Sequence, residues 1–365
     1  MPSLTEKDKE ALLIGIKCGV SYMGQLNYIL HKIHNRLKLI KSHSMRALLN
    51  NFKPSAPTSV RIETVDACNL RCSHCPTGLK MKHNPKNSVV MSEETFEKMI
   101  FLLQKMPSVT SAQFYVGGEP LLNKHLDNMI RRVKEETYVK RISFNTNGML
   151  LNREWAMRLI EAKTDNITIS LDGRSKEEND RIRKGSQYER IKNNIYQLQE
   201  VIDQRNAKTK IKIANTNIQK VNEINETPSI PSFLVEDFIN RGIAVESGFA
   251  LKWPGLSDDY LKENQITQIK SKVFSKVGQE FCTMPFTQFT ILSDGSISTC
   301  CYDLTKNKHL IMGQMNEYDD FIKDVWEGRK WRDLRKAIAS WQLLRKLPDI
   351  CLECGIYTGY LLVRK

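Results

Sequence analysis

The chain has 365 residues, of which 41% are hydrophobic and 26% are charged, and this composition excludes a disordered polypeptide. The length leaves room for one large domain or for a domain with an appendage. The net charge of +14 is unevenly distributed, because residues 11–62 contain basic side chains but no acidic one.

Residues 1–57 are predicted to form a basic, amphipathic helical extension. Apolar residues recur there at intervals of three and four, and two prolines then end the segment. The basic stretch at residues 11–53 suits an anionic membrane surface as a partner. The alternative is a helical cap that packs on the next domain and exposes a solvated basic face.

The first residues do not resemble a secretory signal, and the uncharged stretch 18–30 is too short and too polar to span a bilayer. A cytoplasmic location is therefore expected, with peripheral attachment at the inner membrane surface through the basic segment. The nine cysteines are clustered, and in a reducing compartment such clusters indicate metal ligation over disulfides. The lone Cys18 is interpreted as an apolar helix residue.

Residues 58–250 alternate between short apolar runs and amphipathic helices. The predicted strands are 60–65, 112–116, 141–145, 167–171, 210–214 and 243–249. The predicted helices are 92–106, 125–136, 153–162, 188–204 and 233–240. Ser92 provides an N-cap for the first of these helices. Six such repeats predict an α/β fold with a parallel sheet, open or barrel-like, whose ligands gather at the carboxyl ends of the strands.

Beyond residue 250 the alternation fades, and residues 251–365 are predicted to form a small, metal-stapled domain. A hairpin turn is predicted at residues 294–295, and a helix is predicted from 320 to about 344. That helix leads into Cys351 and Cys354, which belong to the second of two cysteine groups.

The first cysteine group is Cys68, Cys72 and Cys75, which directly follows the first predicted strand. Three thiolates at this spacing can ligate three irons of a [4Fe–4S] cubane and leave the fourth iron open to a small molecule. The alternative is a structural zinc site that adds His74, since Zn²⁺ accepts a Cys₃His ligand set. The residues that follow favour the iron–sulfur cluster.

The C-x3-C-x2-C spacing resembles the signature of the radical S-adenosylmethionine (SAM) superfamily. Gly117-Gly118-Glu119-Pro120, after the second strand, resembles the superfamily's GGEP motif, which implies that this segment binds the amino group of SAM. The resemblance covers residues 59–250 and implies a partial (β/α)6 barrel. It also implies that the open iron is chelated by the amino and carboxylate groups of SAM.

Polar residues at the next two strand ends also resemble SAM-binding segments of the superfamily. The third strand ends in the sequence NTNG, which implies cofactor contacts for Asn145 and Asn147. The fourth strand ends in SLDG, which implies contacts for Ser170 and Asp172. Ordinary turn formation is the alternative for both segments.

The resemblance extends to three more places. Arg181 or Arg183 is expected to meet the cofactor carboxylate, and the sequence does not choose between them. His74 occupies a position next to the adenine, where an imidazole can still stack. Asn215 or Thr216 is expected to serve the adenine from the fifth strand, where no glycine-rich motif is visible.

The second cysteine group is Cys282, Cys300, Cys351 and Cys354, and it resembles the SPASM or twitch extension of radical SAM enzymes. Four thiolates imply one fully ligated auxiliary [4Fe–4S] cluster. Cys301 could replace Cys300, but the spacing from the preceding turn favours Cys300. The alternative is a Cys₄ zinc ribbon.

The resemblance implies two [4Fe–4S] clusters and SAM as cofactors, with a flavodoxin- or ferredoxin-like reductant as partner. It implies an oxidoreductase that activates a C–H bond: SAM is cleaved reductively, and the 5′-deoxyadenosyl radical abstracts a hydrogen from the substrate. The auxiliary cluster then helps to oxidise or couple the substrate radical, and a structural role is the alternative.

The predicted substrate is non-peptidic, because residues 1–57 do not resemble the winged-helix module of peptide-modifying relatives. A lipid, a lipid-linked sugar or a small metabolite is expected. The alternatives are a SPASM maturase that modifies a peptide or protein, an RNA-modifying enzyme and a zinc scaffold without activity. A nucleic acid partner is not expected, since no RNA-binding appendage and no aromatic-basic interleaving occur.

Overall fold

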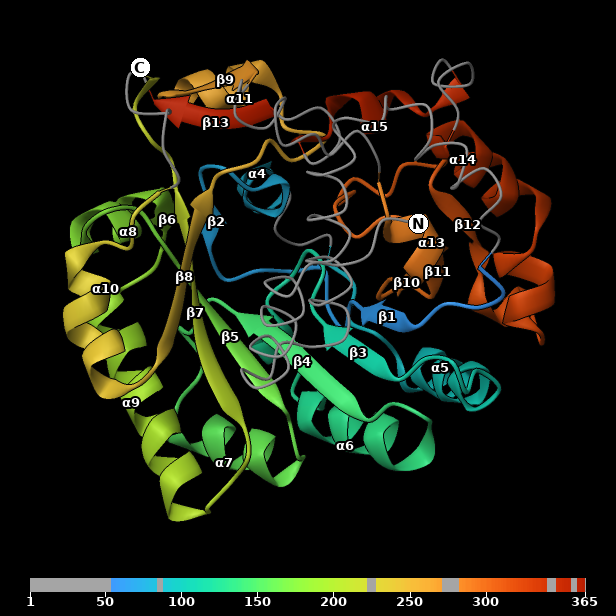
Figure 1. The fold of residues 1–365 in the computed structure, drawn as a ribbon, viewed down its shortest axis with the longest axis horizontal. Helices are drawn as coiled ribbons and strands as arrows, with labels where there is room; N and C mark the ends of the chain where they lie inside the picture. The colour runs from blue at the N-terminus through green and yellow to red at the C-terminus, as the bar shows by residue number, and fades with distance from the viewer. Residues whose placement is uncertain are drawn as a thin grey trace, which may run out of the picture. The chain divides into compact units, whose positions relative to one another are not determined.

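A computed structural model describes residues 54–83, 88–221, 228–270, 282–339, 346–355 and 360–364. At the centre of this part lies a nine-stranded sheet with the strand order β12-β11-β10-β1-β3-β4-β5-β7-β8 (Figure 1). The strands from β1 to β8 in this order pair in parallel. The architecture is the predicted α/β fold with a parallel sheet that curves as a partial barrel.

All six strands predicted between residues 58 and 250 are confirmed. They are β1 (Ser59–Ile62), β3 (Ser111–Phe114), β4 (Arg141–Thr146), β5 (Asn166–Asp172), β7 (Lys210–Asn217) and β8 (Ala244–Phe249). Successive side chains of a strand face opposite sides of the sheet. In β1, Val60 and Ile62 are fully buried in the core, whereas Arg61 lines the interior cavity. The alternation of side chains along β1 thus places apolar residues in the core and the polar Arg61 at the cavity inside the barrel.

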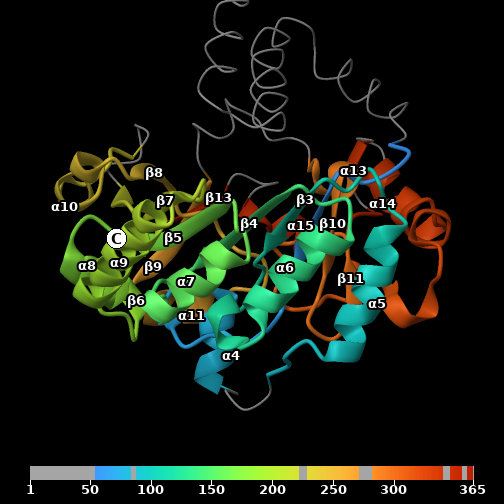
Figure 2. The same ribbon diagram turned by 90° about the horizontal axis from the view of Figure 1, so that it is seen from below.

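The helices that the structure describes between these strands are α4 (Pro76–His83), α5 (Glu93–Gln104), η1 (Pro120–Leu122), α6 (Leu126–Glu136), α7 (Arg153–Glu161), α8 (Lys176–Ile182), α9 (Tyr188–Gln204), α10 (Ser232–Asp237) and η3 (Ile239–Arg241). The five predicted helices are found as α5, α6, α7, α9 and α10 with η3, and the structure adds α4, η1 and α8, which were not predicted. Helices α5, α6, α7 and α9 cover the outer face of the sheet (Figure 2). Ser92 caps α5 as predicted, because its hydroxyl accepts a hydrogen bond from the Thr95 amide at 3.1 Å.

The C-terminal residues extend the barrel sheet, where a separate small domain was expected. Strand β10 (Gln288–Ile291) pairs in parallel with β1. The predicted hairpin joins it to β11 (Ser296–Ser298), which pairs with β12 (Ile311–Gln314). The physical reason is that β1 has an open edge whose backbone groups need partners. Strands β9 (Ile266–Lys270) and β13 (Tyr360–Arg364) form an antiparallel pair of their own.

The helix predicted over residues 320–344 is divided in two, and residues 340–344 lie outside the described part. Segment η5 (Ile322–Trp326) ends before Gly328, and α14 (Arg329–Ala339) begins after it. A Cβ on Gly328 would lie 2.6 Å from the carbonyl oxygen of Asp324. The predicted helix is therefore interrupted at a position where only glycine fits. The remaining short elements are β2 (Arg71–Cys72), β6 (Arg183–Lys184), α11 (Asp258–Glu263), α13 (Met284–Thr287), η4 (Met315–Glu317) and α15 (Asp349–Glu353).

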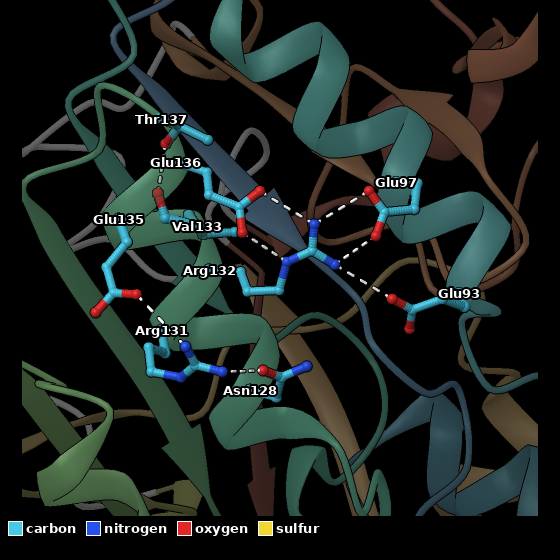
Figure 3. Close-up of polar contacts among 9 residues, drawn as sticks. All are labelled: Glu93, Glu97, Asn128, Arg131, Arg132, Val133, Glu135, Glu136 and Thr137. Carbon is cyan, nitrogen blue, oxygen red and sulfur yellow. Dashed lines mark hydrogen bonds and ion pairs between the residues drawn. The ribbon is translucent and has the colours of Figure 1, made fainter.

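Helices α5 and α6 are joined at the surface by Arg132. Its guanidinium contacts Glu93 and Glu97 of α5 and Glu136 of its own helix, with an Nε–Oε1 distance of 2.7 Å to Glu136 (Figure 3). The guanidinium carbon also lies 5.1 Å from the ring centroid of Phe96. An ion-pair network with a cation–π contact therefore holds the two helices side by side.

The predicted helical extension 1–57, with its basic stretch 11–53 and Cys18, lies outside the described residues apart from residues 54–57. Within the described ranges, no helix is both long enough and apolar enough to cross a membrane. The boundaries at residues 57 and 250, the cytoplasmic location and the contact with an anionic membrane surface stay predictions.

Candidate functional site

A cavity of about 380 Å³ opens at the carboxyl ends of the parallel strands, where the sequence places the ligands. This volume falls in the range typical of small-molecule sites. The last residues of β4, β5, β7 and β8 and the residues that follow β3, β4 and β8 contribute to its wall, together with the first cysteine group. The cavity therefore brings together segments that are far apart in the sequence.

Cys68, Cys72 and Cys75 share one wall of this cavity. The chain turns tightly there: the Cys75 amide donates to the Cys72 carbonyl at 3.3 Å, and the Leu70 amide donates to Cys68 Sγ at 3.4 Å. Burial raises the pKa of Cys68 to about 12 and raises that of Cys72 further. The thiols of Cys68 and Cys72 therefore hold their protons more tightly than an exposed thiol, and binding of a metal cluster to them would release protons.

The segment after β3 runs directly against the loop that carries the cysteines. A Cβ on Gly118 would lie 2.0 Å from the carbonyl oxygen of Val65, so no other residue fits. The Glu119 amide donates to the carbonyl of Ala67 at 2.7 Å. These contacts hold the predicted SAM-binding segment beside Cys68.

The carboxylate of Glu119 is 2% exposed and binds the end of the neighbouring strand. It accepts hydrogen bonds from the Thr146 hydroxyl and the Asn147 amide, both at 2.7 Å, and from the Leu121 amide at 3.2 Å. Burial raises its pKa, although these donors act in the opposite direction. Glu119 thus lines the cavity and also aligns β3 with β4. Pro120 starts η1 and is not among the residues that line the cavity.

The polar residues predicted at the end of β4 and β5 also line the cavity. The Asn147 side chain donates to Asn69 Oδ1 at 2.7 Å, and its Nδ2 atom lies 3.8 Å from Cys68 Sγ. The side chains of Asn145 and Ser170 make no hydrogen bond to the described residues. They are therefore free to bind a ligand.

Arg183 reaches the cavity and Arg181 does not. Arg183 Nη1 lies 2.7 Å from Asp172 Oδ2, and both residues line the cavity. The backbone of Arg183 pairs with Cys72 through the β2–β6 ladder. Arg181 has a 63% exposed side chain that lies 3.4 Å from Glu178. This arrangement supports Arg183 as the partner of the cofactor carboxylate.

His74 lies on the same side of the cavity, with Nε2 at 3.5 Å from Asp172 Oδ2. Burial lowers its pKa, with the Asp172 carboxylate acting in the opposite direction. His74 Nδ1 and Arg183 Nε are buried without a hydrogen-bond partner among the described residues, and a bound ligand would satisfy such atoms. On β7, which is the fifth predicted strand, Thr216 lines the cavity. The Asn215 side chain instead donates hydrogen bonds to the carbonyls of Leu171 and Gly173.

The second cysteine group gathers from three segments of the chain. The thiols of Cys282 and Cys300 both interact electrostatically with Cys354, and so does Cys351. Cys301 also interacts electrostatically with Cys282 and Cys300, but it lines the cavity and accepts a hydrogen bond from Gln288 Nε2 at 3.5 Å. The arrangement supports Cys300, and not Cys301, as the auxiliary ligand.

Sequence reasoning missed the far end of the cavity. Arg61, Tyr115, Trp253 and Tyr302 line it. The Arg61 guanidinium lies 4.8 Å from the Tyr115 ring centroid, and the rings of Trp253 and Tyr302 are 4.6 Å apart. The only signal in the sequence is the alternation of β1, which turns Arg61 away from the apolar core between Val60 and Ile62.

The donor sets of both cysteine groups fit iron–sulfur clusters. Over the ranges that the structure describes, no group of three or more His, Cys, Asp or Glu side chains could hold a single metal ion. Groups of three and of four thiolates suit [4Fe–4S] clusters, because a cubane spreads its thiolate ligands over separate irons. The unpaired atoms of His74 and Arg183 fit a bound SAM molecule.

Comparison with known proteins agrees with this site. Residues 62–224 match the model of the radical SAM superfamily, and residues 282–355 match the SPASM iron–sulfur cluster-binding domain. The structure of Streptococcus suis SuiB bound to S-adenosylmethionine is similar, with a TM-score of 0.51, 16% identity, and coverage of 96% of this chain and 82% of SuiB. The cofactors of this chain are [4Fe–4S] clusters and SAM.

The curated relatives correct the substrate prediction. GTP 3′,8-cyclase of Aquifex aeolicus is 27% identical over 321 residues, which cover 78% of this chain and 95% of the relative. A probable GTP 3′,8-cyclase of Methanococcus maripaludis is 32% identical over 149 residues, or 39% of this chain and 46% of the relative. Because these relatives are named for GTP, the prediction of a lipid or lipid-linked sugar, with a peptide or protein as the alternative, is wrong. A small-molecule substrate agrees with these names.

Proposed function

We propose, on the premise that this chain is a radical SAM enzyme with a C-terminal SPASM domain, that it performs radical chemistry on a nucleotide. The observation that carries this proposal is one continuous cavity. The cysteine group and the SAM-binding residues form one part of its wall, and an arginine with three aromatic residues forms another. When bound, the reduced cluster and SAM supply a 5′-deoxyadenosyl radical that abstracts hydrogen from a C–H bond.

The residues of the chain position the cofactor. Cys68, Cys72 and Cys75 would hold the cluster, and Gly118 lets the GGEP segment pack closely against the loop that carries them. Arg183, anchored by Asp172, is placed to bind a carboxylate with a charge-assisted hydrogen bond. The protein's contribution is to orient the reacting C–H bond and to exclude water.

The other part of the wall suits a nucleotide on chemical grounds. The Nε atom of Arg61 is buried without a partner among the described residues, so an anionic group can bind it. Tyr302 and Trp253 offer aromatic surface to a planar base. The names of the two GTP cyclase relatives support the same substrate class.

The experiment is anaerobic incubation of the iron-loaded enzyme with SAM, dithionite and one nucleotide at a time. We expect a nucleotide, GTP first among those tested, to increase the formation of 5′-deoxyadenosine. GTP deuterated on the ribose would transfer deuterium to 5′-deoxyadenosine, which mass spectrometry detects. Replacement of Arg61 by alanine would weaken the response to nucleotide by about tenfold or more, since a charge-assisted contact is lost.

Two controls separate the parts of the proposal. The triple variant C68A/C72A/C75A would form no 5′-deoxyadenosine, because no site for the catalytic cluster remains. Absence of 5′-deoxyadenosine from the wild-type enzyme under all conditions would contradict the radical chemistry. If 5′-deoxyadenosine formed at the same rate with each nucleotide and without any nucleotide, the choice of a nucleotide as substrate would be contradicted.

A further inference from the structure

The short ribbon formed by β2 and β6 has two different faces. Cys72 and Arg183 pair across it and are both buried, and both line the cavity. Arg71 and Lys184 form the other pair, and both are exposed. Because side chains alternate along a strand, the exposed pair lies on the side opposite to the cysteine.

The exposed pair places two positive charges directly opposite each other. Like charges in this position destabilise a ladder, and here an antiparallel pair of only two residues carries them. Neither Arg71 nor Lys184 forms an ion pair within the described part of the chain; Lys184 donates only to Asn264 Oδ1, at 2.6 Å. Arg181, two residues before β6, instead lies 3.4 Å from Glu178, so the positive charge of the ribbon surface comes from Arg71 and Lys184.

We propose that this basic surface, defined by Arg71 and Lys184, docks the acidic protein that donates electrons to the enzyme. This inference rests on the proposed function, since only a reductively started reaction needs a donor. The ribbon separates the surface from the thiol of Cys72 by one backbone layer, so a docked donor would lie close to the cluster site. In each productive encounter one electron would pass from the reduced donor to the cluster held by Cys68, Cys72 and Cys75. The donor is oxidised by one electron, and the cluster is reduced by one electron.

Charge complementarity selects an acidic partner of the flavodoxin or ferredoxin type. Opposite charges on two proteins accelerate their encounter and fix their orientation. Binding of single-stranded nucleic acid would also need aromatic side chains for base stacking. Among the described residues, none of the exposed large hydrophobic side chains belongs to the ribbon.

The test compares R71E/K184E with the control R329E/K336E, which makes the same change in net charge on helix α14. Figure 1 and Figure 2 both place α14 far from the ribbon. The first readout is the affinity of oxidised flavodoxin for the iron-loaded proteins, measured by calorimetry at low and high salt. At low salt we expect about tenfold weaker binding for R71E/K184E than for wild type and for the control, with a smaller dependence on salt.

The second readout is 5′-deoxyadenosine formation with flavodoxin, its reductase and NADPH, or with dithionite. We expect R71E/K184E to be slow with flavodoxin and to match wild type with dithionite at equal iron content. K184E alone, which leaves the cysteine loop unchanged, should show the same pattern to a smaller extent. The docking proposal would be overturned if R71E/K184E and wild type had equal affinity for flavodoxin and equal flavodoxin-driven rates. It would also be overturned if R71E/K184E lost the same share of its rate with flavodoxin and with dithionite. Failure of wild type with dithionite would instead contradict the proposed function.

Discussion

At the scale of single residues, several positions serve the site through their contacts with other protein groups. Glu119 was expected to bind SAM, and it also joins the ends of β3 and β4 through hydrogen bonds to Thr146 and Asn147. Asp172 holds Arg183 in the cavity. A change at one of these positions should therefore disturb the local packing, and we expect it to weaken the binding of SAM as well.

Gly118→Ala tests how closely the GGEP segment approaches the cysteine loop. The new Cβ would clash with the carbonyl oxygen of Val65, and backbone atoms cannot move aside as a side chain can. We expect the free energy of unfolding to fall by about 1–3 kcal/mol, with loss of SAM binding. Gly117→Ala is the matched control, because its nearest neighbour is a Leu304 side-chain atom at 3.1 Å. Denaturant unfolding and SAM titration would measure both variants, and equal effects would contradict the explanation.

Arg183→Met and Arg181→Met test which arginine belongs to the site. Loss of Arg183 leaves the buried Asp172 without its partner, so we expect about 3 kcal/mol lower stability. SAM affinity should fall by about tenfold or more. Arg181 is exposed, and its replacement should change stability by less than about 0.5 kcal/mol. A larger loss of SAM affinity in the Arg181 variant would reverse the assignment.

At the scale of secondary-structure elements, polar contacts decide how helices and strands are aligned. The two-residue ladder of β2 and β6 fixes Arg183 opposite Cys72, although each strand is too short to predict from periodicity. On the opposite surface of the sheet, the Arg132 network aligns α5 with α6 (Figure 3). Such exposed networks contribute modestly to stability, and their contribution depends on pH.

Arg132→Ala should lower the free energy of unfolding by about 1 kcal/mol at neutral pH, because the ion pairs are exposed to solvent. Hydrogen bonds from Arg132 hold the pKa values of Glu97 and Glu136 below the unfolded value of 4.5. The stability they provide is present above that value and is lost as the pH falls through the lower folded pKa. The difference between wild type and variant should therefore shrink below pH 4.5, as denaturant unfolding at several pH values would show.

Arg131→Ala is the matched control for this network. Arg131 lies on the same helix and forms one exposed pair, at 3.5 Å from Glu135. Its removal should change stability by only a few tenths of a kcal/mol at any pH. Equal effects of the two substitutions would show that the bridging contacts to α5 contribute nothing.

At the scale of the whole molecule, the auxiliary cysteines and the barrel share one structure. Strand β10 pairs with β1, and its residue Phe289 belongs to the same core cluster as Val60. Trp331 of α14 lies in that cluster too, and its indole donates to the Pro285 carbonyl at 2.8 Å. The second cysteine group is therefore positioned by the same core that positions the first.

The iron content tests the assignment of the auxiliary ligands. Two [4Fe–4S] clusters give about eight irons per chain after anaerobic loading. Cys300→Ala should reduce this to about four, because Cys300 interacts with Cys282 and Cys354. Cys301→Ala should keep about eight irons, since Cys301 lines the cavity beside Arg61. Iron loss in the Cys301 variant alone would exchange the two roles.

The sequence by itself determined the parallel β/α repeats, both cysteine groups and the superfamily. These features are local: a strand or helix follows from periodicity, the cap of α5 follows from Ser92, and a cluster site follows from the spacing of Cys68, Cys72 and Cys75. The lipid-type substrate was predicted wrongly, because it was inferred from the N-terminal residues 1–57 and their basic stretch, and not from residues of the cavity.

Only the tertiary structure decided which side chains meet. Arg181 and Arg183 are equivalent in the sequence, and the β2–β6 ladder selects Arg183. The pairing of β10 with β1 joins residues more than 220 positions apart, with Ser59 opposite Gln288, and no local pattern records such a contact. Arg61 lines the cavity because its neighbours in β1, Val60 and Ile62, face the packed core on the other side of the sheet. These contacts depend on long-range packing, which periodicity and spacing along the chain do not encode.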